Sequence, residues 1–151
     1  QISNNGVGCE TYDDVYEDCT GCPYDYVDLL SQAEVDDFII EFPTCTGIDN
    51  LFISGSDIVD LTPLHNLVTA NIAINNNPLL TSLDGLQNLE NSNKIMLQDN
   101  PSLIDVSALG NLTSVYTVDI SSNVQLTEIV GWESLIETTN LKISNNTLLT
   151  S

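Results

Sequence analysis

The chain of 151 residues is predicted to fold as a repeat solenoid, with a single parallel β-sheet of short strands and an N-terminal cap that contains one α-helix. An apolar-x-apolar-x-x-Asn-x-x-Leu pattern begins at Ile72 and returns at Ile95, Val118 and Leu141, at a constant step of 23 residues. A helix-capping sequence precedes the repeats, and all four Cys lie before the first of them. We expect one domain, because this length with 42% hydrophobic residues builds one core.

The N-terminal part divides into an acidic, Cys-containing leader at residues 1–23 and a cap at residues 24–50. The leader is rich in turn-forming residues and has no usable period. Of the 22 acidic residues, 14 lie within the first 60, so this end of the chain is the acidic one. Its carboxylates could gather around Ca²⁺, but their spacing matches no EF-hand loop, and an acidic surface is the preferred interpretation.

The cysteines Cys9, Cys19, Cys22 and Cys45 are even in number and confined to one end, which favours two disulfides in an exported protein. Four cysteines allow three pairings, and we favour Cys9 with Cys19 and Cys22 with Cys45. The second bridge would contribute about 3.5 kcal/mol in the chain-entropy model. The alternative treats Cys19-x-x-Cys22 as half of a zinc site, but no second close pair exists and His65 is distant in sequence.

The cap is predicted to contain a strand and a helix. Weak alternation over residues 24–30 indicates a short strand. Ser31-Gln32-Ala33-Glu34 is a capping box, in which Ser31 accepts from the third helical N–H and Glu34 reaches back to the amide of Ser31. A helix over residues 31–42 follows, and Pro43 ends it. Its apolar face comprises Val35, Phe38, Ile39 and Phe42.

Residues 51–151 form the repeats of about 23 residues. The first repeat is shorter, at 21 residues, and has Gly55-Ser56 at the Asn position. Each repeat offers about six apolar positions that it cannot bury alone, so neighbouring repeats must stack. The last repeat is incomplete at Ser151, and we expect further repeats, a cap, a second copy or a partner to cover this end.

An Asn occupies the point in each repeat where the chain turns away from its strand. We expect these residues to be structural, because an Asn there can pair backbone groups of its own and the adjacent repeat. A glycan-binding row is the disfavoured alternative. The residues are Asn77, Asn100, Asn123 and Asn146.

Charge excludes several partners. The net charge is −20, with two Lys and no Arg, so nucleic acids and anionic lipid surfaces are not expected to bind. No apolar run of about 18 residues indicates a membrane span. The chain begins at Gln1 without an apolar stretch, so a signal peptide is expected to be already removed. Together with the cysteines, this favours an extracellular location.

No enzymatic chemistry, cofactor or metal site is predicted. His65 is the only His, and no nucleophile stands beside it in a catalytic pattern. Its position within the repeat indicates a solvated turn residue. Carboxylates are abundant, but no apolar pocket is evident that would separate their pKa values.

Alternation places the residues that flank the buried strand positions on the opposite, outward face of the sheet. This face carries amides, hydroxyls, both Lys, and the apolar Phe52 and Met96. It is the expected ligand surface, although a merely solvated polar sheet is the alternative. The candidate binding residues are Phe52, Asn71, Ala73, Asn75, Lys94, Met96, Gln98, Asp119, Ser121 and Lys142.

The stretches 76–86 and 111–115, with the cap segment 31–38 before a Cys, resemble extracellular leucine-rich repeats of bacterial surface proteins and are similar to receptor L-domains. The resemblance covers roughly residues 22–151. It implies a non-enzymatic binding or adhesion module and transfers no catalytic residue. The chain departs from the pattern in its short first repeat, in Ser54-Gly55-Ser56, and in lacking a recognisable C-terminal cap.

The sequence therefore predicts a secreted or cell-surface module that binds a protein or a polysaccharide. A structural subunit of an extracellular fibre or coat, assembled by end-to-end stacking, is the alternative. Ligand binding by a monomer would favour the first, and assembly without ligand the second.

Overall fold

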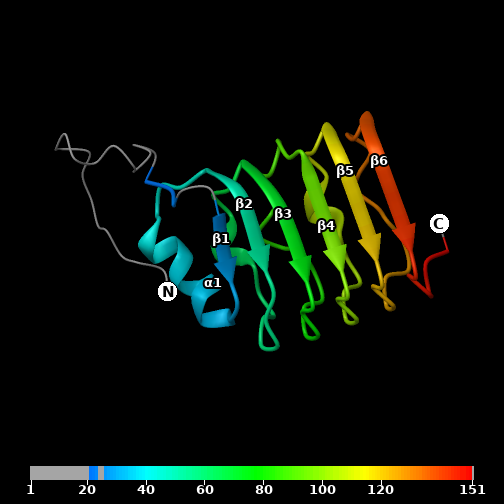
Figure 1. Cartoon of the computed structure of the whole chain (residues 1–151), viewed down its shortest axis with the longest axis horizontal. Coiled ribbons are helices and arrows are strands. Elements are labelled where there is room, and N and C mark those ends of the chain that lie inside the picture. Colours follow the sequence, from blue (N-terminus) through cyan, green and yellow to red (C-terminus); the bar gives the residue numbers. More distant parts are fainter. Residues whose placement is uncertain (1–20, 24–25, 151) are drawn as a thin grey trace.

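The computed structural model describes residues 21–23 and 26–150, which form one parallel β-sheet of six strands in sequence order. Figure 1 shows all the strands pointing the same way, with β1 at one end of the sheet and β6 at the other. The predicted single parallel sheet is confirmed. The strands are β1 Tyr26–Leu29, β2 Gly47–Ile53, β3 Thr69–Asn75, β4 Lys94–Gln98, β5 Ser114–Ser121 and β6 Glu137–Ser144.

The 23-residue period sets the register of the later strands. Ile72 of β3 lies opposite Ile95 of β4, and Ile95 lies opposite Val118 of β5. These side chains face the core, so a slip of one residue would turn the apolar side of a strand outward. From β2 to β6, each strand is longer than the three-residue apolar-x-apolar part of its repeat. The residues before the first apolar position also pair with the neighbouring strand.

The segments that connect successive strands return behind the sheet and complete the core. Their leucines occur every three residues, which matches the two short 3₁₀ helices η1 (Thr62–Leu64) and η2 (Ser107–Leu109). Burying this set against the strands is the main source of stability. The buried leucines of these segments include Leu61, Leu64, Leu67, Leu80, Leu83, Leu86, Leu89, Leu103, Leu109, Leu112 and Leu126.

The helix α1 (Gln32–Glu41) lies within the predicted residues 31–42 and packs against β1 and η1 at the β1 end of the sheet (Figure 1). Val35 and Phe38 are its buried residues. Ser31 accepts the amide of Glu34, as predicted. The carboxylate of Glu34, however, accepts the amide of Leu30 rather than that of Ser31. The expected reciprocal bond is thus shifted by one residue, to the residue that joins β1 to the N-cap.

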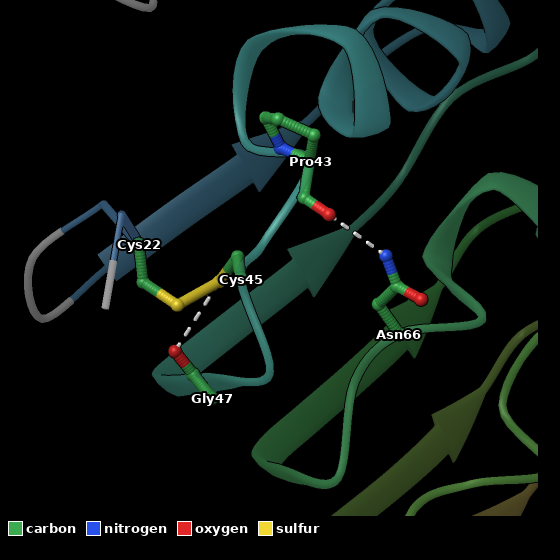
Figure 2. Close-up of a disulfide and its surroundings, with 5 residues drawn as sticks. All are labelled: Cys22, Pro43, Cys45, Gly47 and Asn66. Carbon is green, nitrogen blue, oxygen red and sulfur yellow. Dashed lines mark hydrogen bonds between the residues drawn. A yellow bond between two sulfur atoms is a disulfide. The ribbon is translucent and has the colours of Figure 1, made fainter. Parts of the chain in front are cut away.

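A disulfide joins Cys22 and Cys45, so the predicted pairing of these two residues is confirmed (Figure 2). Both half-cystines are buried, and together they enclose β1 and α1. Cys22 is therefore not a zinc ligand. The predicted Cys9–Cys19 bridge and the weighed calcium site of the leader lie outside the described residues.

Gln32 links α1 to the following turn of chain. Its Oε1 accepts the amides of Val59 and Asp60 at 2.8 and 3.0 Å, and its Nε2 donates to the carbonyl of Asp60 at 2.9 Å. The backbone of Gln32 also donates to Asp57. The helix is held to the first repeat by these bonds as well as by packing.

The β6 end of the sheet is the least covered part. Leu141 and Ile143 are 59% and 44% exposed, whereas their counterparts Ile72 and Ile74 on β3 are at most 1% exposed. In the described part of the chain, no helix is long and apolar enough to cross a membrane.

Candidate functional site

The candidate site is the outward face of the sheet, which carries the side chains that alternate with the buried strand residues. One line of residues crosses this face with one member from each strand, in register. Asp28 pairs with Phe52, Phe52 with Ala73, Ala73 with Met96, Met96 with Asp119, and Asp119 with Lys142. We call this line the middle row: Asp28, Phe52, Ala73, Met96, Asp119 and Lys142.

An aromatic pair lies at the β1 end of the face. The rings of Tyr26 and Phe52 are 4.8 Å apart between centroids and tilted by 32°. Tyr26 is 53% exposed and Phe52 is half-buried, so the pair presents apolar ring surface to solvent. The hydrogen bond to Asp28, a smaller burial effect and the negative charge of Asp28 all raise the pKa of Tyr26.

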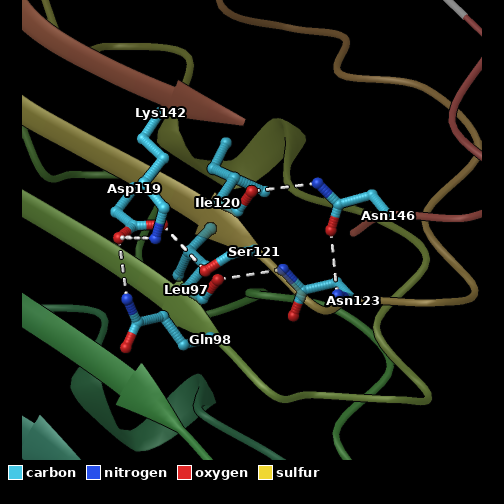
Figure 3. A network of polar contacts seen from close by, with 8 residues as sticks. All are labelled: Leu97, Gln98, Asp119, Ile120, Ser121, Asn123, Lys142 and Asn146. Carbon is cyan, nitrogen blue, oxygen red and sulfur yellow. Dashed lines mark hydrogen bonds and ion pairs between the residues drawn. The ribbon is translucent and has the colours of Figure 1, made fainter. Parts of the chain in front are cut away.

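A polar cluster lies at the β6 end of the same face (Figure 3). Asp119 Oδ2 accepts from Lys142 Nζ at 2.9 Å and from Gln98 Nε2 at 2.8 Å. Its Oδ1 accepts from Ser121 Oγ at 2.8 Å. These contacts join β4, β5 and β6 across the face and fix the orientation of the carboxylate and of the Gln98 amide.

Asp119 remains ionised in this cluster. Partial burial by itself would raise its pKa, but the hydrogen bonds from Lys142, Ser121 and Gln98, with attraction to the Lys142 charge, outweigh burial and lower it. The carboxylate is therefore an acceptor with a fixed position over the physiological pH range.

The turn asparagines hold the strand ends in place. Each one donates its Nδ2 to a carbonyl at the end of the preceding strand, as Asn100 does to Ile74 at 2.8 Å and Asn123 to Leu97 at 2.9 Å. The Oδ1 of Asn100 accepts the backbone N–H of Asn77 at 3.0 Å, and this bond repeats 23 residues later. The hydrogen bonds expected of Asn77, Asn100, Asn123 and Asn146 are present, and the first three are fully buried.

The residue before each turn Asn has a positive φ, between 55° and 60°. This left-handed conformation turns the chain away from the sheet, and Asn and Asp tolerate it best. Sequence reasoning missed this row, although the Asn and Asp at three of the four positions were a usable signal. The residues are Asn76, Asp99, Ser122 and Asn145.

The predicted site residues differ in what they offer to a ligand. Ala73 and Ser121 are only 4% and 7% exposed, so they contribute little contact surface. Asn71 Oδ1 is occupied by the amide of Asn93. Asn75 Oδ1 is buried without a hydrogen-bond partner, and Lys94 is exposed. The accessible candidates are therefore Phe52, Met96, Gln98 and Lys142, with Lys94 beside them on β4, whereas the Asp119 side chain is only 13% exposed.

Two outward residues, Tyr26 and Asp28, were not among the predicted site residues. The alternation of the predicted strand over residues 24–30 could have placed them there, because Val27 and Leu29 are the buried partners in β1. Their contact with Phe52 depends on the β1–β2 register, which the repeat period does not specify.

His65 lies outside this face. It is exposed, and its Nδ1 is 2.9 Å from the carbonyl oxygen of Thr62, as suits a turn residue. Within the described residues, no three side chains of His, Cys, Asp or Glu converge in a way that would hold a metal ion.

No known protein family, curated protein or solved structure matches the chain.

Proposed function

We propose that the chain is a secreted or cell-surface leucine-rich-repeat solenoid that recognises a protein or a polysaccharide through the outward face of its sheet. The strand register and the turn asparagines, both repeating at 23 residues, support the solenoid. The Cys22–Cys45 disulfide supports an oxidising, extracellular location. The observation that carries the binding proposal is that one face combines a solvent-facing aromatic pair with an ordered polar cluster.

A retention experiment tests the binding function. The purified chain is immobilised and exposed separately to the protein fraction and the polysaccharide fraction of a cell-surface extract. Met96→Glu and Lys142→Glu are the test variants, since each changes the face without entering the core. We expect components retained by the wild-type chain to be retained less by both variants, while the melting temperature changes little. Equal retention by the wild type and the variants would show that the outward face takes no part in binding.

The exposed β6 end favours a second candidate, a building block of a fibre or coat. A sheet edge with unpaired backbone groups above apolar residues pairs readily with another chain. Light scattering at rising protein concentration tests this candidate. Assembly that Ile143→Lys reverses would support it, whereas a monomer at every concentration would reject it.

A further inference from the structure

We propose that the outward face binds a neutral oligosaccharide that lies across the strands along the middle row. This inference rests on the proposed binding function and narrows its ligand to one chemical class. It follows from the size of the face, the kind of groups on it, and its charge.

The size of the face along the middle row matches a short linear polymer. The row from Phe52 to Lys142 crosses four strand intervals, or about 19 Å. A few sugar rings in an extended chain cover this length.

The inner strands cannot pair with a peptide backbone. Each of β2 to β5 has hydrogen-bonded neighbours on both sides, so a chain laid across them meets side chains only. A peptide in that position would lose water from its own N–H and C=O groups without regular replacement. A sugar chain has no such obligatory backbone pairs, and its hydroxyls can bond individually with the side chains present.

The chemistry of the row changes along its length in a way that matches a pyranose chain. Tyr26 and Phe52 offer ring surface for the C–H face of a sugar, and the half-buried Met96 extends this apolar surface. Ala73 between them is small, so a flat ring can approach the sheet closely there. Beyond Met96, the carboxylate of Asp119 and the amide of Gln98 are held in place by their mutual hydrogen bond, and their remaining lone pairs and N–H are the groups that would bond sugar hydroxyls.

Charge disfavours an anionic ligand. The chain carries −20 overall, and the middle row itself contains Asp28 and Asp119. One of the two lysines of the face, Lys142, is paired with Asp119. An anionic polysaccharide would therefore meet net repulsion, whereas a neutral one loses nothing.

The test is a titration of the full chain with three neutral hexasaccharides, cellohexaose, laminarihexaose and mannohexaose, and with an anionic hexagalacturonate. Binding is followed by calorimetry and by amide NMR shifts. We expect at least one neutral probe to bind, with shifts centred on Phe52, Met96 and Asp119, and the anionic probe not to bind. Phe52→Ala and Asp119→Asn should each weaken the affinity by about tenfold. The matched control is Ile40→Ala, at an exposed apolar position on α1.

Each outcome is decisive. If Phe52→Ala unfolds the chain, Met96→Glu replaces it, because Met96 is only half-buried. Absence of binding by all three neutral probes at millimolar concentration overturns the proposal, and so does binding that neither face variant weakens. If the protein fraction of the extract is retained through the face while the sugars fail, the binding function stands and the ligand class is wrong. If neither is retained, both proposals fall.

Discussion

At the scale of single residues, burial separates two rows of Asn that make similar hydrogen bonds. Asn100 is fully buried, and its side chain bonds the backbone of the preceding repeat at Ile74 and Asn77. Asn111 is exposed and donates to the carbonyl of Gln87 at 2.6 Å. In the same way, Asn66 donates to the carbonyl of Pro43 and Asn88 to the carbonyl of His65. This second row occupies the other corner of the repeat, and only the first row was predicted.

Asn100→Ala should lower the free energy of unfolding by about 2–5 kcal/mol. The substitution leaves the buried N–H of Asn77 unpaired, at about 1–3 kcal/mol, and removes one hydrogen bond to the carbonyl of Ile74, at about 0.5–1.5 kcal/mol. Asn111→Ala is the control and should cost less than about 1 kcal/mol, because water replaces its bond. Urea unfolding measures both, and equal costs would contradict the structural role of the buried row.

Gly55 shows why the first repeat departs from the others. It donates its N–H to Asn77 Oδ1 at 2.8 Å, as the turn asparagines do to their successors. A Cβ added at Gly55 would lie 2.4 Å from the carbonyl oxygen of Leu30. The strand-to-helix connection of the cap therefore occupies the space that an Asn side chain would need.

Gly55→Asn, which restores the repeat consensus, should destabilise the fold, as should Gly55→Ala. Both place a Cβ against backbone that cannot move without shifting β1 and α1, so we expect a loss of about 1–3 kcal/mol. Gly47→Ala is the matched control, since its added Cβ would meet Thr69 only at 3.8 Å. A higher melting temperature for Gly55→Asn would refute this explanation.

At the scale of elements, sequence reasoning succeeded where the signal is local. The capping box and Pro43 define α1, and apolar alternation places Ile72, Ile95 and Val118 in the core. It missed contacts between segments distant in the chain. The bonds of Gln32 to residues 57–60 and the packing of Tyr26 on Phe52 depend on how the cap meets the first repeat. No repeat pattern extends across that junction.

The sequence predicted which residues lie on the outward face, but not which of their side chains contact one another. Alternation identified the outward residues on β2 to β6. It did not show that Gln98, Ser121 and Lys142 would converge on Asp119, because side-chain pairing across strands depends on rotamers as well as register. For the same reason, the near-complete burial of Ala73 beneath its neighbours was not foreseen.

The cluster that joins β4, β5 and β6 should make a pH-dependent contribution to stability. Because the pKa of Asp119 is lowered in the folded state, its contribution is present above the pKa of the unfolded chain, near 3.8, and is lost as pH falls through the folded-state pKa. The stability difference between wild type and Asp119→Asn should thus be constant near pH 7 and shrink below about pH 4. Thermal melts across this range measure it, with Asp105→Asn as an exposed control. A difference that grows on acidification would mean that the cluster does not favour the charged carboxylate.

At the scale of the whole molecule, charge opposes the fold. A net charge of −20 on a small chain produces repulsion between many pairs of acidic side chains. The one ion pair among the described residues joins Asp119 to Lys142, whose side chain is 60% exposed, so this pair contributes little to stability. Three exposed acidic residues of α1, Asp36, Asp37 and Glu41, add to this repulsion. Long-range repulsion should therefore dominate over the attractive pair.

Raising NaCl from about 20 mM to about 300 mM should stabilise the protein, because the screening length falls below the separation of most like charges. We expect a rise of a few degrees in melting temperature. The variant with Asp36→Asn, Asp37→Asn and Glu41→Gln carries three fewer negative charges and should be more stable at low salt and respond less to added salt. A salt-induced loss of stability in the wild-type chain would show instead that local attraction, chiefly Asp119 with Lys142, outweighs the repulsion. The triple variant separates screening from a general salt effect, since a general effect would shift both proteins equally.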